Sequence, residues 1–234
     1  MEAMKQQHCR LPVLNLHCKL SSASMRVLVL CVFLSLGCLA QRPQPCTSPS
    51  LLTGNLAVST TDEKLLVYAK FTYDAVREHI RLTEFGYHNN KTFHLDLLFL
   101  FKQAVVYHID DKTHTCIKFH LDTKFHPLAI PQNASLLAQV VLGSSSGPGQ
   151  GVLVNSWVGG LMILGEQAKY LSTFTEFGCI PVSNMLHTNT SGWQVTSFFN
   201  IVIGLADPQR LIPPHFCEDA RLEDKDPVTF FSFF

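Results

Sequence analysis

The sequence predicts a mostly β domain built as a sandwich or a half-open barrel. Short segments of alternating apolar and polar residues recur along the chain between turn-forming residues, and such alternation is typical of antiparallel strands. Neither an internal repeat nor a long amphipathic helical pattern accompanies them in the sequence. About ten strands in roughly 190 residues fit either architecture.

The predicted strands follow a proline-rich entry at residues 42–50. They lie at residues 65–73, 78–85, 93–101, 104–109, 115–121, 152–158, 169–177 and 193–205. Residues 136–142 are apolar and lead into a Gly- and Ser-rich run at residues 143–151, which we interpret as a flexible hairpin tip or linker. Residues 159–165 receive no assignment, and an acidic, then Phe-rich, tail follows from about residue 218.

Residues 1–40 are predicted to be a signal peptide rather than part of the fold. Arg26 precedes an apolar run at residues 27–36, and Cys38 and Ala40 are small residues where a signal peptidase reads the chain. The run is shorter than the about twenty apolar residues that span a bilayer, so a membrane anchor is the less favoured alternative. We expect cleavage after Ala40, with Met25 as an alternative start, and one domain over residues 41–234.

The predicted mature chain carries few charges. Charged residues make up 15% of the whole sequence, and the prefix removes four basic residues and one acidic residue, which leaves 14 basic against 17 acidic. This balance provides neither a basic patch for nucleic acid nor a polybasic membrane segment. The apolar-rich composition fits a large core or an internal cavity.

Four cysteines remain after the prefix, at Cys46, Cys116, Cys179 and Cys217. They are widely spaced and form no C-x-x-C pair, which argues against zinc ribbons and thioredoxin-like redox chemistry. An even number of dispersed cysteines in a secretory chain predicts two disulfides, and three pairings are open.

Three sequons predict N-glycosylation. Asn90, Asn133 and Asn189 each begin an N-x-S/T triplet without proline in the middle. In a secreted chain we expect a glycan on one or more of them, and therefore a surface position for each.

Residues 143–147 match the G-x-S-x-G pattern of serine hydrolases. That chemistry requires the serine on a tight strand-to-helix turn beside an oxyanion hole. Ser145 lies among Ser, Gly and Pro, and no helical pattern follows it. A flexible loop is therefore favoured, and we predict no catalytic site.

Two groups of potential metal ligands are better explained as exposed polar residues. His108, Asp110, Asp111 and His114 are close in sequence, yet side chains on a hairpin turn would diverge. The acidic tail fits a solvated terminus, with weak calcium association as the alternative. Its carboxylates are Glu218, Asp219, Glu223, Asp224 and Asp226.

The strand expected at residues 93–101 is almost wholly apolar. Phe93, Leu95, Leu97, Phe99 and Phe101 alternate onto one face. This face would either fill an ordinary core or line a cavity for an apolar ligand, and both interpretations stay open.

Several short segments together resemble the ependymin family of secreted glycoproteins, known from fish, and more distantly the ependymin-related proteins. Their combined order and spacing, from about Arg42 onwards, carries the resemblance. The segments are RPQPC at 42–46, HNNKT at 88–92, VYHID at 106–110 leading to Cys116, IP at 130–131, GCIPV at 178–182 and PPHFCE at 213–218.

This resemblance implies a fold, a covalent pattern and a function. The implied fold is an antiparallel two-sheet, half-open β-barrel with a hydrophobic pocket, similar to bacterial lipoprotein carriers, and the implied assembly is a homodimer. The implied disulfides pair Cys46 with Cys179 and Cys116 with Cys217. The implied role is non-enzymatic: weak calcium binding, largely through sialic acids on glycans, in cell–matrix adhesion and neural plasticity. Lipid or glycolipid carriage, with a lysosomal location, is the alternative.

The sequence departs from the family pattern in two places. It lacks both cysteines of the third disulfide of the ependymin-related branch, which places it nearer the fish ependymins. Thr113-His114-Thr115 stands where typical ependymins carry a sequon before the middle cysteine. Glycan-mediated calcium binding would then depend on the sequons that remain.

Overall fold

The computed structural model describes residues 26–27, 29–30, 42–61, 65–88, 91–163, 166–189 and 192–223. The chain divides into two units, Met1–Arg42 and Pro43–Phe234. In the first unit, Arg26, Val27, Val29 and Leu30 are helical and exposed, whereas the expected cleavage site at Ala40 lies outside the described residues. Among the helices that are described, none has the length and apolar character needed to cross a membrane.

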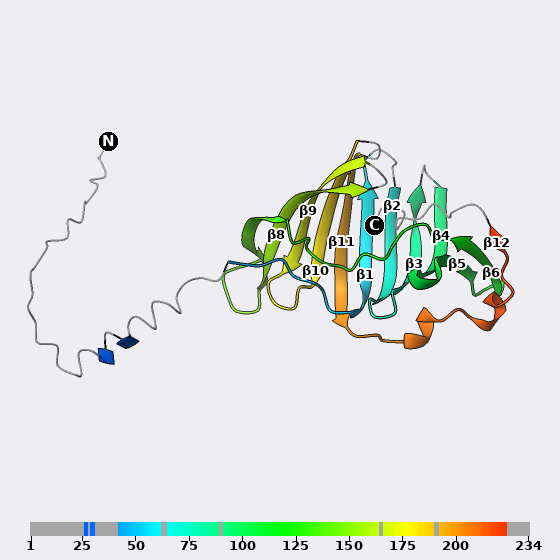
Figure 1. Cartoon of the computed structure of the whole chain (residues 1–234), viewed down its shortest axis with the longest axis horizontal. Coiled ribbons are helices and arrows are strands. Elements are labelled where there is room, and N and C mark those ends of the chain that lie inside the picture. Colours follow the sequence, from blue (N-terminus) through cyan, green and yellow to red (C-terminus); the bar gives the residue numbers. More distant parts are fainter. Residues whose placement is uncertain are drawn as a thin grey trace, which may run out of the picture. The chain divides into compact units, whose positions relative to one another are not determined.

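Pro43–Phe234 forms one hydrogen-bonded sheet in which twelve strands are described (Figure 1). The strands are β1 (Leu51–Thr60), β2 (Leu65–Asp74), β3 (His79–His88), β4 (Lys91–Leu100), β5 (Val105–Asp110), β6 (Thr115–His120), β7 (Ser135–Gly143), β8 (Gly151–Ile163), β9 (Glu166–Thr175), β10 (Pro181–Thr188), β11 (Gly192–Ile203) and β12 (Leu222–Glu223). Three short 3-10 helices, η1 (Phe101–Gln103), η2 (Pro208–Leu211) and η3 (His215–Cys217), connect or follow them.

The sheet consists of two meanders joined at its centre. Its order is β12-β6-β5-β4-β3-β2-β1-β11-β10-β9-β8-β7, and the described pairs are antiparallel apart from β12 with β6. The mostly antiparallel β prediction is confirmed. The resemblance implied two sheets, but hydrogen bonding runs unbroken because β1 pairs with β2 on one side and with β11 on the other. Among the described strands, β12 and β7 stand at the two ends of the order and do not pair, so the described sheet is not closed into a barrel.

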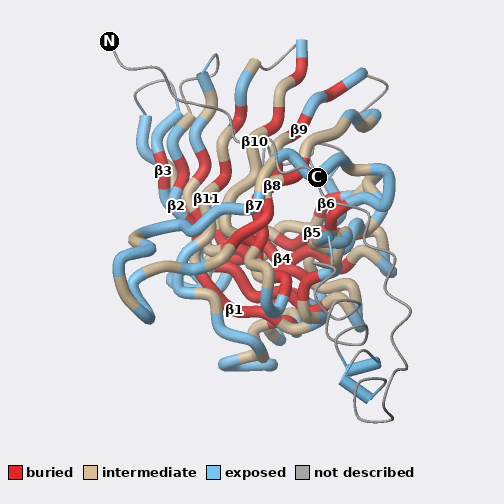
Figure 2. Tube along the Cα trace, turned by 90° about the vertical axis from the view of Figure 1, so that its left-hand side faces the viewer, coloured by how far each residue is buried: buried red, intermediate tan, exposed pale blue. Residues whose placement is uncertain are grey.

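Alternation of side chains explains how the strands bury one face. In β2, Val67, Ala69 and Phe71 are buried, whereas Leu66 and Tyr68 between them are exposed, as the two-residue period of a strand requires. Figure 2 shows that the buried residues gather in the middle parts of the strands. The largest buried cluster joins β1 to β6, and it includes Leu56, Leu82 and Leu97 at 2% exposure or less.

Turn chemistry agrees with the sequence between β2 and β3. The predicted strands at 65–73 and 78–85 leave a turn between them, and there the Oδ1 of Asp74 accepts hydrogen bonds from the backbone N–H groups of Val76 and Arg77, both at 2.9 Å. Asp110 acts in the same way after β5, where its Oδ1 accepts from the N–H of Lys112 at 2.9 Å. These side-chain acceptors stabilise the turns in place of backbone partners.

The C-terminal segment after β11 crosses the outer face of β3 to β6. Leu211 of η2 is fully buried there, in a cluster with Leu98 and Tyr107. Arg81 forms a two-point ion pair with Asp96, with N–O distances of 2.8 and 2.9 Å, and also donates to the carbonyl of Arg210 at 3.1 Å.

Both disulfides that the resemblance implies are present. Cys46 pairs with Cys179, and Cys116 pairs with Cys217. The second bond holds η3 against β6, so the end of the C-terminal segment is covalently fixed to the edge of the sheet.

Several elements differ from the sequence-based expectation. β1 and β10 were not predicted as strands. Residues 159–163, which received no assignment, continue β8, and residues 136–142 form most of β7. The run at residues 143–151 is a hairpin tip rather than a linker, because Gly143 pairs directly with Gly151.

Candidate functional site

A pocket of about 610 Å³ lies against strands β8 to β11. One wall is formed by side chains of these strands, and the other by the segment Thr123–Pro131 between β6 and β7. The lining residues are Thr123, Lys124, His126, Pro127, Leu128, Ala129, Pro131, Leu161, Met162, Tyr170, Ser172, Phe174, Pro181, Ser183, Asn184, Leu186 and Phe198. Most of this surface is apolar, so the pocket favours a ligand with a large apolar part.

Strand register places the sheet wall of the pocket. Tyr170 pairs with Leu186, and Ser172 pairs with Asn184, across β9 and β10. Because directly paired residues of antiparallel strands point to the same face, these four side chains form one continuous surface. Phe174 extends the surface along β9.

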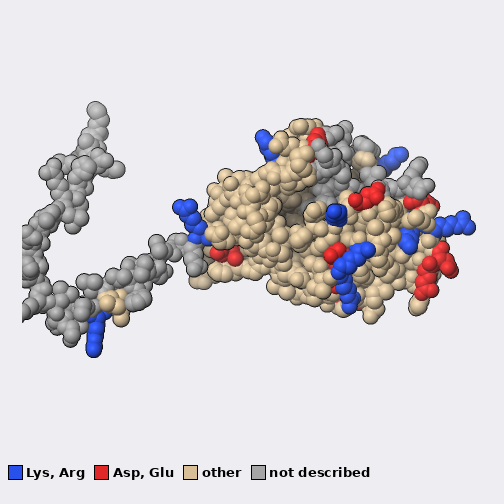
Figure 3. Space-filling model, in the orientation of Figure 1, with Lys and Arg blue, Asp and Glu red and all other residues tan. Residues whose placement is uncertain are grey.

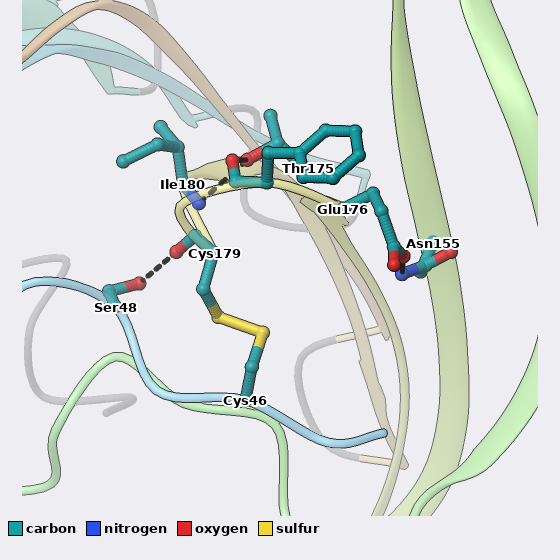
Figure 4. The surroundings of a disulfide bond; sticks show 8 residues. Cys46, Ser48, Asn155, Thr175, Glu176, Cys179 and Ile180 are labelled. Atoms are coloured by element: carbon teal, nitrogen blue, oxygen red, sulfur yellow. Dashed lines mark hydrogen bonds between the residues drawn. A yellow bond between two sulfur atoms is a disulfide. The ribbon is translucent and has the colours of Figure 1, made fainter. Parts of the chain in front are cut away.

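The opposite wall is fastened to the start of the domain. The N–H of Ser48 donates to the carbonyl of Leu128, and the N–H of Ile130 donates to the carbonyl of Cys46, both at 2.8 Å. Figure 4 shows that Ser48 also donates from Oγ to the carbonyl of Cys179, beside the Cys46–Cys179 disulfide. The disulfide therefore links residues that support both walls.

Few polar groups face the apolar interior of the pocket. The ring of Tyr170 lines the pocket, whereas its hydroxyl is buried against Gly159 of β8 without a hydrogen-bond partner in the described structure, and burial raises the pKa of Tyr170. Ser172 Oγ donates to Asn184 Oδ1 at 2.8 Å. Lys124 and His126 are exposed members of the lining. An apolar chamber with the polar pair Ser172 and Asn184 and the cationic rim residue Lys124 suits an amphiphile better than a pure hydrocarbon.

The five residues predicted to line a cavity do not line this pocket. Leu97 and Phe99 are buried in the largest core cluster, and Phe93, Leu95 and Phe101 pack against it. One link to the pocket exists: the Phe101 ring lies 5.3 Å from that of Phe125, which belongs to the segment Thr123–Pro131. Phe101, in η1 directly after β4, therefore packs against the segment that forms this pocket wall.

None of the residues that line this pocket was predicted from the sequence to do so. Ser172 and Asn184 are polar at inward positions, so β9 and β10 lack a clear apolar stripe there. A usable signal was the combination of Tyr170, Phe174 and Leu186 at alternating positions in segments bounded by turns.

Two of the three sequons lie on described turns. Asn133 is exposed in the turn before β7, and Asn189 is exposed directly after β10. Asn90 lies outside the described residues. Both described positions are sterically open to a glycan.

The serine motif occupies the hairpin tip between β7 and β8, not a strand-to-helix turn. Ser145 is exposed there, and the neighbouring Ser144 Oγ accepts a hydrogen bond from the N–H of Ser146. The local geometry that a serine nucleophile needs is therefore not the geometry of this loop.

The side chains considered as potential metal ligands contact different partners and do not converge on one point. The Asp110 carboxylate caps its own turn, Asp111 lies 3.7 Å from Arg81, and the His114 ring contacts Phe216. Within the described ranges, no three His, Cys, Asp or Glu side chains are grouped to hold a metal ion. Glu218, Asp219 and Glu223 are exposed, whereas Asp224 and Asp226 lie outside these ranges.

A disulfide-linked antiparallel β domain with an apolar pocket is the class that fold and site define. Comparison with known proteins then gives the family. The Ependymin family model matches residues 89–217. Ependymin-2 of Carassius auratus and Ependymin of Notemigonus crysoleucas are each 34% identical over 213 residues, which cover 89% of this chain and 98% of theirs. The chain belongs to the ependymin family.

A further relative and a solved structure extend the comparison. Ependymin of Esox lucius is 33% identical over 197 residues, covering 82% of this chain and 86% of that protein. The crystal structure of an uncharacterized conserved protein from Thermus thermophilus aligns with a TM-score of 0.47 and 9% identity, over 79% of this chain and 92% of that chain. This second likeness is too weak to establish a shared fold.

Proposed function

We propose that this ependymin is a secreted, non-enzymatic protein that binds an amphiphilic lipid in the pocket between β8–β11 and Thr123–Pro131. The pocket carries the proposal. Its volume of about 610 Å³ falls in the range of small-molecule sites, and such sites combine apolar walls with a few polar groups.

The polar groups suggest how such a ligand would be oriented. The apolar chain would lie against Leu161, Leu186 and Phe174, where it displaces water from apolar surface. The side-chain amide of Asn184, which lines the pocket, would donate to a polar atom of the ligand. An anionic headgroup would meet Lys124 at the rim.

Ligand displacement tests this function. Protein secreted from eukaryotic cells is examined by native mass spectrometry, and binding is measured by displacement of a fluorescent fatty acid. Leu161→Trp adds bulk inside the pocket and is expected to weaken binding at least tenfold. Leu66→Trp is the matched control, because Leu66 is 54% exposed and does not line the pocket. Absence of bound lipid together with absence of displacement would reject the proposal.

Glycan-mediated calcium binding is a second candidate function. It is supported by the exposed positions of Asn133 and Asn189 on turns, where sialylated glycans would present carboxylates to the solvent. Calcium titration before and after removal of sialic acid tests it. Binding that is lost with sialic acid is the expected result, and no binding in either form would reject it.

The location and partners follow from the same proposal. A secreted chain is expected in the culture medium with its N-terminus at Gln41, and an N-terminus before Val27 would contradict the signal peptide. Contact with extracellular matrix, delivery to lysosomes and the homodimer stay predictions that the family resemblance implies.

A further inference from the structure

The sheet wall of the pocket carries a polar pair set between aromatic side chains. Ser172 of β9 and Asn184 of β10 are directly paired across the two strands, and both line the pocket. Tyr170 and Phe174, which flank Ser172 on the same face of β9, line it as well. A plain hydrocarbon chain lying on the pair would exclude water without offering a new hydrogen-bond partner, which costs binding energy. The pair is therefore placed to decide which lipids bind.

The hydrogen bond within the pair sets the orientation of the Asn184 amide. Ser172 Oγ donates to Asn184 Oδ1 at 2.8 Å, and Ser172 itself is buried. The amide oxygen is thus occupied, whereas the amide nitrogen, on the other side of the same planar group, has no hydrogen-bond partner among the described residues. An amide nitrogen carries two N–H donors. Asn184 therefore offers hydrogen-bond donors to the pocket.

Donors in apolar surroundings select a ligand with a neutral acceptor beside them. A carboxylate on the apolar wall would lose its hydration, whereas at the rim, where Lys124 is exposed, it would keep part of its water. An alcohol can accept from Asn184, but it brings a proton that needs an acceptor of its own. The carbonyl oxygen of an ester accepts a hydrogen bond and brings no proton, so it matches the amide best.

The charges around the pocket agree with a neutral group at this position. The described lining residues include neither Asp nor Glu. Figure 3 shows a hollow in the face that the segment Thr123–Pro131 crosses, and side chains other than Lys, Arg, Asp and Glu form most of its visible border. Charged side chains gather instead toward the β6 and β12 end of the molecule. Hydrogen bonding, rather than charge, is thus the means of recognition on the sheet wall.

We propose that the Ser172–Asn184 pair makes the pocket selective for acyl lipids with a neutral ester carbonyl. Asn184 Nδ2 is the donor to that carbonyl, and Ser172 is the positioning residue that orients the amide. Monoacylglycerols are the simplest lipids of this class. The inference rests on the proposed lipid-binding function and adds the functional group that the ligand carries. A lipid of the same length without a carbonyl leaves the Asn184 donors unpaired and binds more weakly.

Two ligands that differ only in the carbonyl test the selectivity. Monooleoylglycerol is an ester, and its ether analogue monooleylglycerol has the same chain and headgroup without the carbonyl. Each competes with a fluorescent fatty acid for the full secreted chain. The selectivity is the dissociation constant of the ether divided by that of the ester. It is compared between protein variants, so that the unequal solubility of the two lipids cancels.

Removal of the polar pair should remove the selectivity. The double variant Ser172→Ala with Asn184→Leu leaves no orphaned polar group, so we expect it to fold and to lower the selectivity about fivefold, the worth of roughly one hydrogen bond. Ser172→Ala alone lets the amide rotate and should lower it by a smaller factor. The matched control is Ser156→Ala with Thr173→Val. These two residues form a comparable pair between β8 and β9, with Oγ and Oγ1 3.0 Å apart, but do not line the pocket, so the selectivity should stay at the wild-type value.

The outcomes distinguish this inference from the proposed function. Displacement by neither lipid would reject lipid binding itself, and the inference with it. Displacement by both lipids, with the same selectivity in the wild type and in the double variant, would leave lipid binding in place and overturn the role of the pair. A loss of selectivity in the double variant without any change in Ser172→Ala would overturn the positioning role of Ser172.

Discussion

Glu84 is a carboxylic acid inside the apolar core. It lies on β3, on the same face as the buried Leu82, and is 1% exposed. Its Oε1 atom has no hydrogen-bond partner in the part of the chain that is described. Burial raises the pKa of Glu84 from its ordinary value of 4.5 to about 7, because the charged form loses its hydration.

This shift predicts a pH-dependent stability. The folded state holds the Glu84 proton more tightly than the unfolded chain, so the stabilising effect is complete below about pH 4.5 and is lost as the pH rises through about 7. The loss amounts to roughly 3 kcal/mol. Glu84→Gln stays neutral and should lack this decline, which urea unfolding of both proteins at pH 5 and pH 8 measures. Parallel pH profiles of wild type and variant would contradict the assignment.

Gly159 allows the ring of Tyr170 to lie directly against β8. A Cβ atom at Gly159 would lie 2.4 Å from the Tyr170 hydroxyl oxygen and 2.6 Å from the ring carbon that carries it, which is closer than atoms approach without displacement. Gly159→Ala should therefore push Tyr170 into the pocket. We expect fatty-acid affinity to fall about tenfold, measured by displacement.

A matched control for this substitution is available. Gly160 is adjacent, and its added Cβ would meet the carbonyl of Ala168 at 3.5 Å, an ordinary contact. Gly160→Ala should leave affinity unchanged. Equal affinities for the two variants would show that Tyr170 does not shape the binding site.

At the scale of elements, the C-terminal segment is held by charge as well as by its disulfide. The side chains of Arg81 and Asp96 are 8% and 11% exposed, so their pair is largely shielded from water. Asp96→Ala would leave the Arg81 cation buried without its main partner, and we expect a loss of roughly 3 kcal/mol of unfolding free energy. Urea unfolding with intact disulfides measures it.

A double variant distinguishes the cost of an unpaired buried charge from the cost of losing the ion pair itself. Arg81→Met combined with Asp96→Leu removes both charges, and should cost less than Asp96→Ala because no unpaired ion remains buried. A loss below about 1 kcal/mol for Asp96→Ala would place the pair among weak surface bridges.

Sequence reasoning predicted the strands with clear alternation and the long apolar run of β4, and it missed β1 and β10, whose apolar pattern is interrupted by polar residues. In β2, β3 and β6 apolar and polar residues alternate, because one face packs in the core and the other carries polar side chains that meet water or, like Arg81, pair beneath the C-terminal segment. β1 carries Gly54 and Asn55 at its centre, where its register with β11 shifts, so its pattern is irregular. β10 begins with Pro181, and its inward Asn184 bonds to Ser172, which inverts the expected polarity.

The pocket could not be predicted from the sequence, because its walls come from segments that are far apart in the chain. The apolar row of β4 was a sound signal for burial, and Leu97 and Phe99 are indeed in the core. Whether such a row fills space or borders a cavity depends on the segment opposite it. That segment, Thr123–Pro131, has no regular structure, and backbone bonds to Cys46 and Ser48 hold it in place. Contacts between segments so distant in sequence leave no local pattern.

At the scale of the whole molecule, the Cys46–Cys179 disulfide joins the start of the domain to the turn that precedes β10, across a sequence separation of 133 residues. Replacing both cysteines by serine should lower the unfolding free energy by about 5 kcal/mol in the chain-entropy model. It should also loosen the wall at Thr123–Pro131 and weaken lipid binding. Thermal unfolding and displacement measure the two effects, and unchanged affinity would show that the backbone bonds alone hold the wall.

The pairing of β1 with β11, which joins the two meanders, affects the order in which the sheet forms during synthesis. β1 is synthesised early, and its partner follows roughly 140 residues later, which takes on the order of ten seconds at cellular rates of elongation. During that interval β1 has one unpaired edge, and Cys46 cannot yet form its disulfide because Cys179 has not been synthesised. The centre of the finished sheet is therefore among the last places to close during biosynthesis, and the stage most exposed to mispairing between nascent chains.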